Sequence, residues 1–143
     1  MSRVQGPAYE IRDHTADILL RAWGASWPDL FCNALAGLYG ALGSIVTTDH
    51  CHPVTVSLAA EDGEGLFHDW LSEALYYVEA RHQVLEVARF AQLNETRLRA
   101  DAVAHAIDME RSAFDREVKA VTYHELAIRR EDDRWVATVV LDI

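Results

Sequence analysis

Two groups of residues at opposite ends of the sequence have the side chains needed to bind a cation. The stretch DHTAD places Asp13, His14 and Asp17 within five positions, and the sequence ends in Asp142 and Ile143. A terminal strand would bring a side-chain carboxylate, a carbonyl and an α-carboxylate close together, and such oxygen ligands suit Ca²⁺ or Mg²⁺. The spacing leaves another interpretation open, in which Asp17 caps a turn and the last residues fray in water.

The two groups can share an ion only if the strands that carry them are neighbours in a sheet. Alternating apolar residues predict a strand over 17–23, and a shorter strand is expected over 8–12. The segments VKAVTYHELAIRR and RWVATVVLDI predict a terminal hairpin with its turn at 131–133. The order of these strands does not follow from the pattern.

The middle of the chain predicts two helices and three further strands. Apolar residues recur every three or four positions over 27–43 and 64–81, with Ser26 as the expected N-cap of the first helix. A loop is expected over about 44–53, before a strand in VTVSLAA. VLEVARFAQL and RLRADAVAH predict consecutive strands joined at Asn94, and 105–117 is expected to be irregular.

These elements indicate a two-layer α+β fold, in which two helices cover one face of a largely antiparallel sheet. We expect one domain over residues 1–143, in which residues 1–7 form a loose leader. The signature sequences of common hydrolases and nucleotide-binding loops, such as GxSxG, HExxH and GxGxxG, are absent from the sequence.

The charge of the chain narrows the classes of partner. There are 23 acidic side chains against 13 Lys and Arg, a formal charge of −10. A phosphate backbone requires a basic surface, so direct nucleic-acid binding is not expected, whereas a cation or a basic protein is a suitable partner. No apolar run is long enough for a membrane span or a signal peptide, which favours a cytoplasmic location.

The two cysteines, Cys32 and Cys51, fit a reducing compartment. Cys51 lies in DHCHP, where a zinc site would need a companion pair of ligands at the usual spacing. The sequence has no such pair, so we interpret this stretch as a solvated loop.

Several motifs, in order along the chain, resemble the archease family. They are DHTADILLRAWG, HDWLSEALYYVE, VKAVTYHEL and the terminal W-x-A-x-V-V-x-D-I, which together span about Tyr9 to Ile143. Archeases are small α+β proteins that assist the RtcB-type RNA ligase, an enzyme that uses Mn²⁺ and passes through a GMP-linked histidine. The resemblance therefore implies a non-catalytic protein that promotes ligase guanylylation and multiple turnover in tRNA splicing and RNA repair.

The resemblance also implies a divalent-cation site, for Ca²⁺ first and Mg²⁺ or Mn²⁺ as alternatives. Its implied ligands are Asp17, Asp142 and Ile143. Asp13 and His14 would shape the turn or support the ligands. Four residues of the VKAVTYHEL motif would lie near the site or on the partner surface: Lys119, Thr122, Tyr123 and His124.

Two other functions remain open at this point. One is a general chaperone or modulator of tRNA-modifying enzymes, a role also proposed for the family. The other is a small metal-dependent hydrolase in which His14 acts as base beside an ion held by Asp17 and Asp142. The chain also departs from the family pattern at Ala104-His105, Arg111-Ser112 and His124-Glu125. The resemblance therefore does not settle the role of the face formed by residues 104–125 in the choice of partner.

Overall fold

A computed structural model describes the chain over residues 7–14 and 16–143, without the side chains of Asp13 and His14. The expected leader therefore lies outside the described residues except for Pro7, and Thr15 of the DHTAD stretch lies outside them as well. Within the described residues, every strand pair is antiparallel.

The first sheet contains the strands that carry the candidate ligands. Its strand order is β1 (Tyr9–His14), β2 (Asp17–Gly24), β10 (Arg134–Asp142) and β8 (Ala120–Val121), and β9 (Ala127–Glu131) also pairs with β10. The expected terminal hairpin is confirmed as β9 and β10. β10 also pairs with β2, so the last strand of the chain lies beside one of the first.

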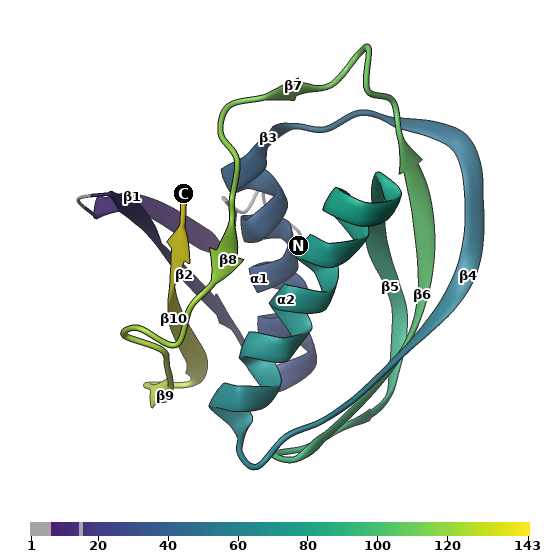
Figure 1. Cartoon of the computed structure of the whole chain (residues 1–143). Coiled ribbons are helices and arrows are strands. Elements are labelled where there is room, and N and C mark those ends of the chain that lie inside the picture. Colours follow the sequence, from purple (N-terminus) through teal and green to yellow (C-terminus); the bar gives the residue numbers. More distant parts are fainter. Residues whose placement is uncertain (1–6, 15) are drawn as a thin grey trace, which may run out of the picture.

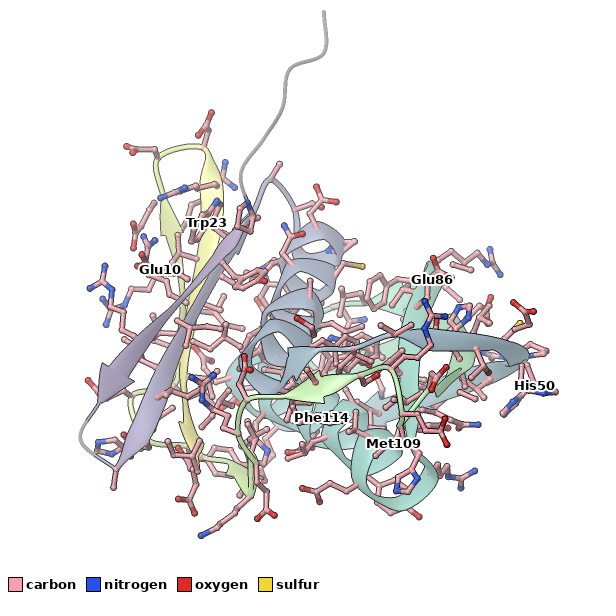
Figure 2. The ribbon with its side chains drawn as sticks, turned by 90° about the horizontal axis from the view of Figure 1, so that it is seen from above. Glu10, Trp23, His50, Glu86, Met109 and Phe114 are labelled. Carbon is pink, nitrogen blue, oxygen red and sulfur yellow. The ribbon has the colours of Figure 1, made fainter. Side chains whose placement is uncertain are left out.

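The second large sheet has the order β4 (Thr47–Ala59), β6 (Arg97–Ile107) and β5 (Gln83–Leu93). A short pair, β3 (Gly43–Ser44) with β7 (Ala113–Phe114), joins the end of the first helix to the irregular segment that follows β6. The α+β prediction is confirmed. The strands are divided between sheets on either side of the two helices, rather than gathered under one face of them (Figures 1 and 2).

Both helices begin and end where local chemistry favours it. α1 (Trp27–Leu42) starts after Ser26, whose side chain accepts a hydrogen bond from Asp29 N at 3.3 Å. α2 (Gly63–Arg81) starts after Asp62, whose Oδ1 accepts from Gly65 N at 2.7 Å. Each side chain satisfies one of the backbone donors left unpaired in a first helical turn.

An aromatic cluster links the two helices to the second sheet. The ring of Phe31 on α1 lies edge-on to Phe67 on α2 at 5.3 Å and to Phe90 on β5 at 6.4 Å. The indole of Trp70 donates to the Phe31 carbonyl at 3.0 Å, so its polar group is satisfied inside the core. This packing fixes the helices against which the first sheet lies.

One expectation about the fold is wrong. Residues 47–53 belong to the edge strand β4, where a loop was expected. This strand pairs with β6 at Thr47 and from Cys51 onward, with an irregularity between them. Their side chains are mostly exposed, so this half of the strand lacks the apolar alternation that marks a strand in a sequence. Cys51 is exposed on this strand, opposite His105.

The backbone at Glu125 is in the left-handed region, with φ of 55°. Glu125 is one of the positions at which the chain departs from the family pattern, and glycine would adopt the same conformation there without a Cβ clash. The turn between β8 and β9 therefore contains a glutamate whose backbone is strained by its left-handed conformation.

We expect Glu125→Gly to raise the free energy of unfolding by about 0.5–1 kcal/mol. The relief of left-handed strain, about 1–2 kcal/mol, outweighs the greater flexibility of glycine in the unfolded chain. Urea denaturation measures the change. Glu110→Gly is the matched control, because Glu110 is exposed and has no positive φ; equal or lower stability of Glu125→Gly would contradict the strain.

Candidate metal centre at the end of the β2–β10 pair

The register of the first sheet places the two predicted carboxylates directly opposite each other. Asp17 begins β2 and Asp142 ends β10, and they are cross-strand partners. Side chains of directly opposed residues have Cβ atoms about 4.5–5.5 Å apart and lie on the same face of the sheet. The neighbouring pair, Ile18 and Leu141, is buried in the core, so the two carboxylates project from the opposite face.

The end of β10 is tied to the fold on both sides. Asp142 pairs with Asp17 on one side, and its carbonyl oxygen accepts from Lys119 N at 2.7 Å on the other. The side chain of Ile143 is half-buried and packs against the hydrophobic core. These contacts do not support the interpretation in which the last residues fray.

The KAVTYH segment extends the pairing of the short strand β8 with β10. Thr122 N donates to the Val140 carbonyl at 3.0 Å, and Thr122 Oγ1 donates to the same oxygen at 2.8 Å. Thr122 Oγ1 also accepts from His124 N at 3.1 Å. The threonine of this motif therefore holds the segment against the strand that carries Asp142.

Lys119 and Tyr123 lie on the α2 side of this segment. Val121 lies two residues from each of them and therefore on the same face of the strand. It is buried opposite Leu141, on the face toward the core. Lys119 borders a hollow beside α2, and the ring of Tyr123 stacks on His68 at 3.9 Å with an angle of 11° between the planes. The structure thus separates these two residues from the face that carries Asp17 and Asp142.

His68 is a contact residue that the sequence analysis did not single out. Its Nε2 lies 2.8 Å from the Val121 carbonyl oxygen and its Nδ1 lies 3.0 Å from Asp69 Oδ1. Both partners accept hydrogen bonds, so His68 links α2 to β8 through its ring. The only sequence feature that pointed to a role for His68 was its position next to Asp69 in HDWLSEAL. A His-Asp pair by itself is typical of the polar face of a helix.

Asp13, His14 and His124 are the remaining residues predicted to lie at or near the site. His14 pairs with Asp17 across β1 and β2, and Asp13 pairs with Ile18, but the side chains of Asp13 and His14 lie outside the described part of the chain. His124 is exposed, and its Nε2 lies 3.8 Å from Glu125 Oε2. The row across the sheet end therefore runs from His14 through Asp17 and Asp142 to Ala120.

The donor set at this sheet end fits a hard divalent cation. Two carboxylates on adjacent strands can approach one ion, and the main-chain oxygens of Ile143 follow directly in the sequence. Among described side chains, no group of three or more His, Cys, Asp and Glu is arranged to hold a metal. The main chain of Ile143 is therefore the candidate for a third protein ligand among the described residues.

Two side chains elsewhere have raised pKa values for structural reasons. Burial raises the pKa of the Tyr39 phenol, whose oxygen accepts from Leu85 N at 2.7 Å. Burial, and then the nearby carboxylate of Asp29, raise the pKa of the Cys32 thiol. A raised pKa leaves less thiolate at neutral pH, which is typical of a core cysteine rather than a reactive one.

Two of the three departures from the family pattern lie away from Asp17 and Asp142. Ala104 is buried in β6, and His105 beside it contacts Glu86 Oε1 at 2.9 Å on the second sheet. The Ser112 hydroxyl donates to the Val46 carbonyl at 3.1 Å and accepts from Val46 N at 2.8 Å. Two of the three departures thus belong to the second sheet and its connection to the irregular segment.

Comparison with known proteins supports the resemblance over almost the whole chain. Residues 9–143 match the model of the archease protein family. The chain is 34% identical to the protein archease of Methanosarcina barkeri over 143 residues, covering 97% of this chain and 98% of that protein. It is 35% identical to the protein archease of Methanosarcina acetivorans over 146 residues, with the same coverage.

Solved structures agree with the fold. Protein 1598 of Methanobacterium thermoautotrophicum superposes with a TM-score of 0.73 at 24% identity, covering 96% of this chain and all of that one. An archease from Thermotoga maritima, described as a possible chaperone, superposes with a TM-score of 0.67 at 23% identity over the full length of both chains. Within the described residues, no helix is long and apolar enough to cross a membrane. From the family match and the similarity to these relatives, the chain belongs to the archease family.

Proposed function

We propose that this protein is a non-catalytic activator of an RtcB-type RNA ligase and that it acts through a divalent cation held by Asp17, Asp142 and the main chain of Ile143. The observation that carries the proposal is the direct cross-strand pairing of Asp17 with Asp142. Membership of the archease family supports an RtcB-type ligase as the partner, because the family is known to assist that enzyme. The ion is expected to be Ca²⁺, with Mg²⁺ or Mn²⁺ as alternatives, because all the ligands are oxygen atoms.

A bound cation would relieve the repulsion between the two carboxylates and complete a charged site at the exposed end of the first sheet. Asp142 is exposed and Asp17 half-buried, so a partner can reach the site. The chain itself would supply position and charge, while the ligase would supply the nucleotide and the reacting histidine. The formal charge of −10 favours encounter with a basic, RNA-binding partner.

The chaperone alternative makes a different prediction. A general chaperone would protect unrelated proteins from aggregation whether or not Asp17 is intact. An activator of the ligase would require Asp17 and Asp142 and would leave unrelated proteins unaffected.

The ligase guanylylation assay tests the proposed activity. Adding the wild-type protein should increase the rate at which GMP becomes attached to the ligase and allow repeated turnover. Asp17→Asn and Asp142→Asn should each weaken activation by about tenfold or more, since loss of a group that supports a metal typically costs that much. Asp132→Asn and Asp133→Asn, in the exposed β9–β10 turn, should activate normally; activation by Asp17→Asn equal to wild type would exclude the site from this function.

The cation itself should stabilise the fold. Ca²⁺ at about 100 times its dissociation constant should add about 2.7 kcal/mol to the free energy of unfolding, because it binds only the folded site. Thermal melts with Ca²⁺, with Mg²⁺ and with chelator measure the shift, which should be several degrees for a domain of this size. Asp17→Asn should lose the shift and Asp132→Asn should keep it. An equal shift in both variants would place the ion elsewhere.

An extension after Ile143 should weaken the site. One added glycine keeps the Ile143 carbonyl but moves the terminal negative charge by a residue, and hard divalent cations favour charge-dense oxygen ligands. We expect weaker Ca²⁺ binding by calorimetry and weaker ligase activation with the added glycine or a C-terminal hexahistidine tag than with an N-terminal tag. If the extended protein bound Ca²⁺ as tightly as the wild type, Ile143 would not be a ligand.

A further inference from the structure

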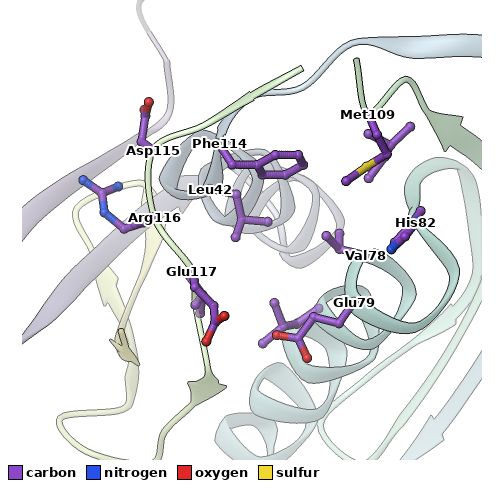
Figure 3. Close-up of a pocket in the computed structure, with 12 residues that line it drawn as sticks. Leu42, Val78, Glu79, His82, Met109, Phe114, Asp115, Arg116 and Glu117 are labelled. Carbon is purple, nitrogen blue, oxygen red and sulfur yellow. The ribbon is translucent and has the colours of Figure 1, made fainter. Parts of the chain in front are cut away.

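The large hydrophobic side chains that are exposed in the described part of the chain gather along one side of α2. They are Tyr76, Met109, Phe114 and Tyr123, with exposed fractions of 51%, 50%, 40% and 63%. Tyr76 belongs to α2, and Tyr123 stacks on His68 of the same helix. Met109 and Phe114 come from the segment after β6 and border a hollow against the C-terminal half of α2 (Figure 3).

This hollow has the size of a binding site for side chains of a partner. It measures about 470 Å³ and adjoins a second hollow of about 260 Å³, and the two share Leu75 and Glu79 on their walls. We call them together the α2 groove. Apolar side chains from both helices and from the facing segment line the larger hollow: Leu42, Leu75, Val78, Ile107 and Val118. Cavities of about 300–1,000 Å³ are typical of ligand sites.

Carboxylates border this apolar surface. Glu79 on α2 and Glu117 on the facing segment lie on opposite walls at one end of the hollow, and Asp115 lies further along the segment (Figure 3). Within the described residues, none of these three carboxylates forms a hydrogen bond or an ion pair. Three basic residues line the same walls. Arg116 Nη1 donates to the Ala41 carbonyl at the end of α1. His82 borders the larger hollow, and Lys119 borders the smaller one with Glu79 but forms no ion pair with it.

We propose that the α2 groove binds a short segment of a partner protein in which an apolar side chain is flanked by Lys or Arg. The apolar residue would fill the larger hollow between Phe114, Met109 and Val78. The basic residues would pair with Glu79 and Glu117, which form no ion pair within the described residues. The larger hollow contains no residue of the row that carries Asp17 and Asp142, whereas the smaller hollow extends to Ala120, the cross-strand neighbour of Asp142.

A second copy of this chain fits the groove less well than a basic partner. Each copy has a formal charge of −10, so self-association would bring acidic surfaces together. Residues 1–6 include Arg3 and Val4, which have the chemistry the groove would accept and are therefore tested as an occupant from the same chain.

The experiment uses the full chain and a random 12-residue peptide library displayed on phage. Two groove variants, Glu79→Lys/Glu117→Lys and Met109→Ser/Phe114→Ser, change residues that are exposed and so should fold normally, which thermal melting verifies. Glu95→Lys/Asp133→Lys is the control, because it changes the net charge equally at exposed turns outside the groove. Selected peptides are then measured against all four proteins by calorimetry.

Peptides with an apolar residue flanked by Lys or Arg should be enriched and should bind the wild type and the control alike. Each groove variant should bind them about tenfold or more weakly, as expected for loss of central contacts in an interface. Equal binding to the groove variants, enrichment of acidic peptides, or no enrichment would overturn the proposal.

Two further outcomes would assign the groove to another occupant and overturn the proposal. One is a dimer in sedimentation experiments that dissociates in Met109→Ser/Phe114→Ser. The other is tighter peptide binding by the full-length Arg3→Glu/Val4→Ser variant than by the wild type. A monomer at all concentrations and unchanged binding by that variant would support a partner protein.

Discussion

The pairing of β2 with β10 joins residues near the start of the chain to its last strand, and the rest of the first sheet is arranged around it. Eight residue pairs, from Trp135–Gly24 to Asp142–Asp17, hold the two strands together. β1 adds to the outer edge of β2, while β8 and β9 add to β10. A shift of this register by one residue would turn every side chain of β10 to the opposite face, burying Asp142 and separating it from Asp17.

The helices make that register the favourable one. Ile18, Leu20 and Ala22 on β2 and Ala137, Val139 and Leu141 on β10 are all buried on the face toward α1. Each alternates with a residue on the outer face, so the buried pairs fix which residues are opposed at the sheet end. The carboxylates are therefore brought together by hydrophobic packing several residues away, and the repulsion between them is tolerated at an exposed end where solvent or a cation can compensate it.

Elements with a strong local pattern could be predicted from the sequence, and long-range pairings could not. Ser26 and the apolar period after it define α1, and Asn94 marks the β5–β6 turn because its Oδ1 accepts from the Thr96 and Arg97 backbone.

The first half of β4 could not be predicted as a strand because its side chains are exposed. The division into sheets was missed because local alternation does not specify which strands pair. Asp17 and Asp142 were brought together in the sequence analysis only by the family resemblance, since the long stretch of chain between them carries no spacing signal. His68 was missed because a polar residue on a helix is usually solvated.

The proposed function depends on one divalent cation, which we propose is held by Asp17 and Asp142 between neighbouring strands. The most direct measurement is a crystal structure of the protein grown with Ca²⁺, with the ion replaced by Mn²⁺ in a second crystal so that anomalous scattering locates it. We expect one peak at the end of the β2–β10 pair, with carboxylate oxygens of both Asp17 and Asp142 within about 2.3–2.6 Å of Ca²⁺. Peaks confined to other acidic surfaces, or an ordered sheet end with no ion at saturating Ca²⁺ and Mn²⁺, would contradict it.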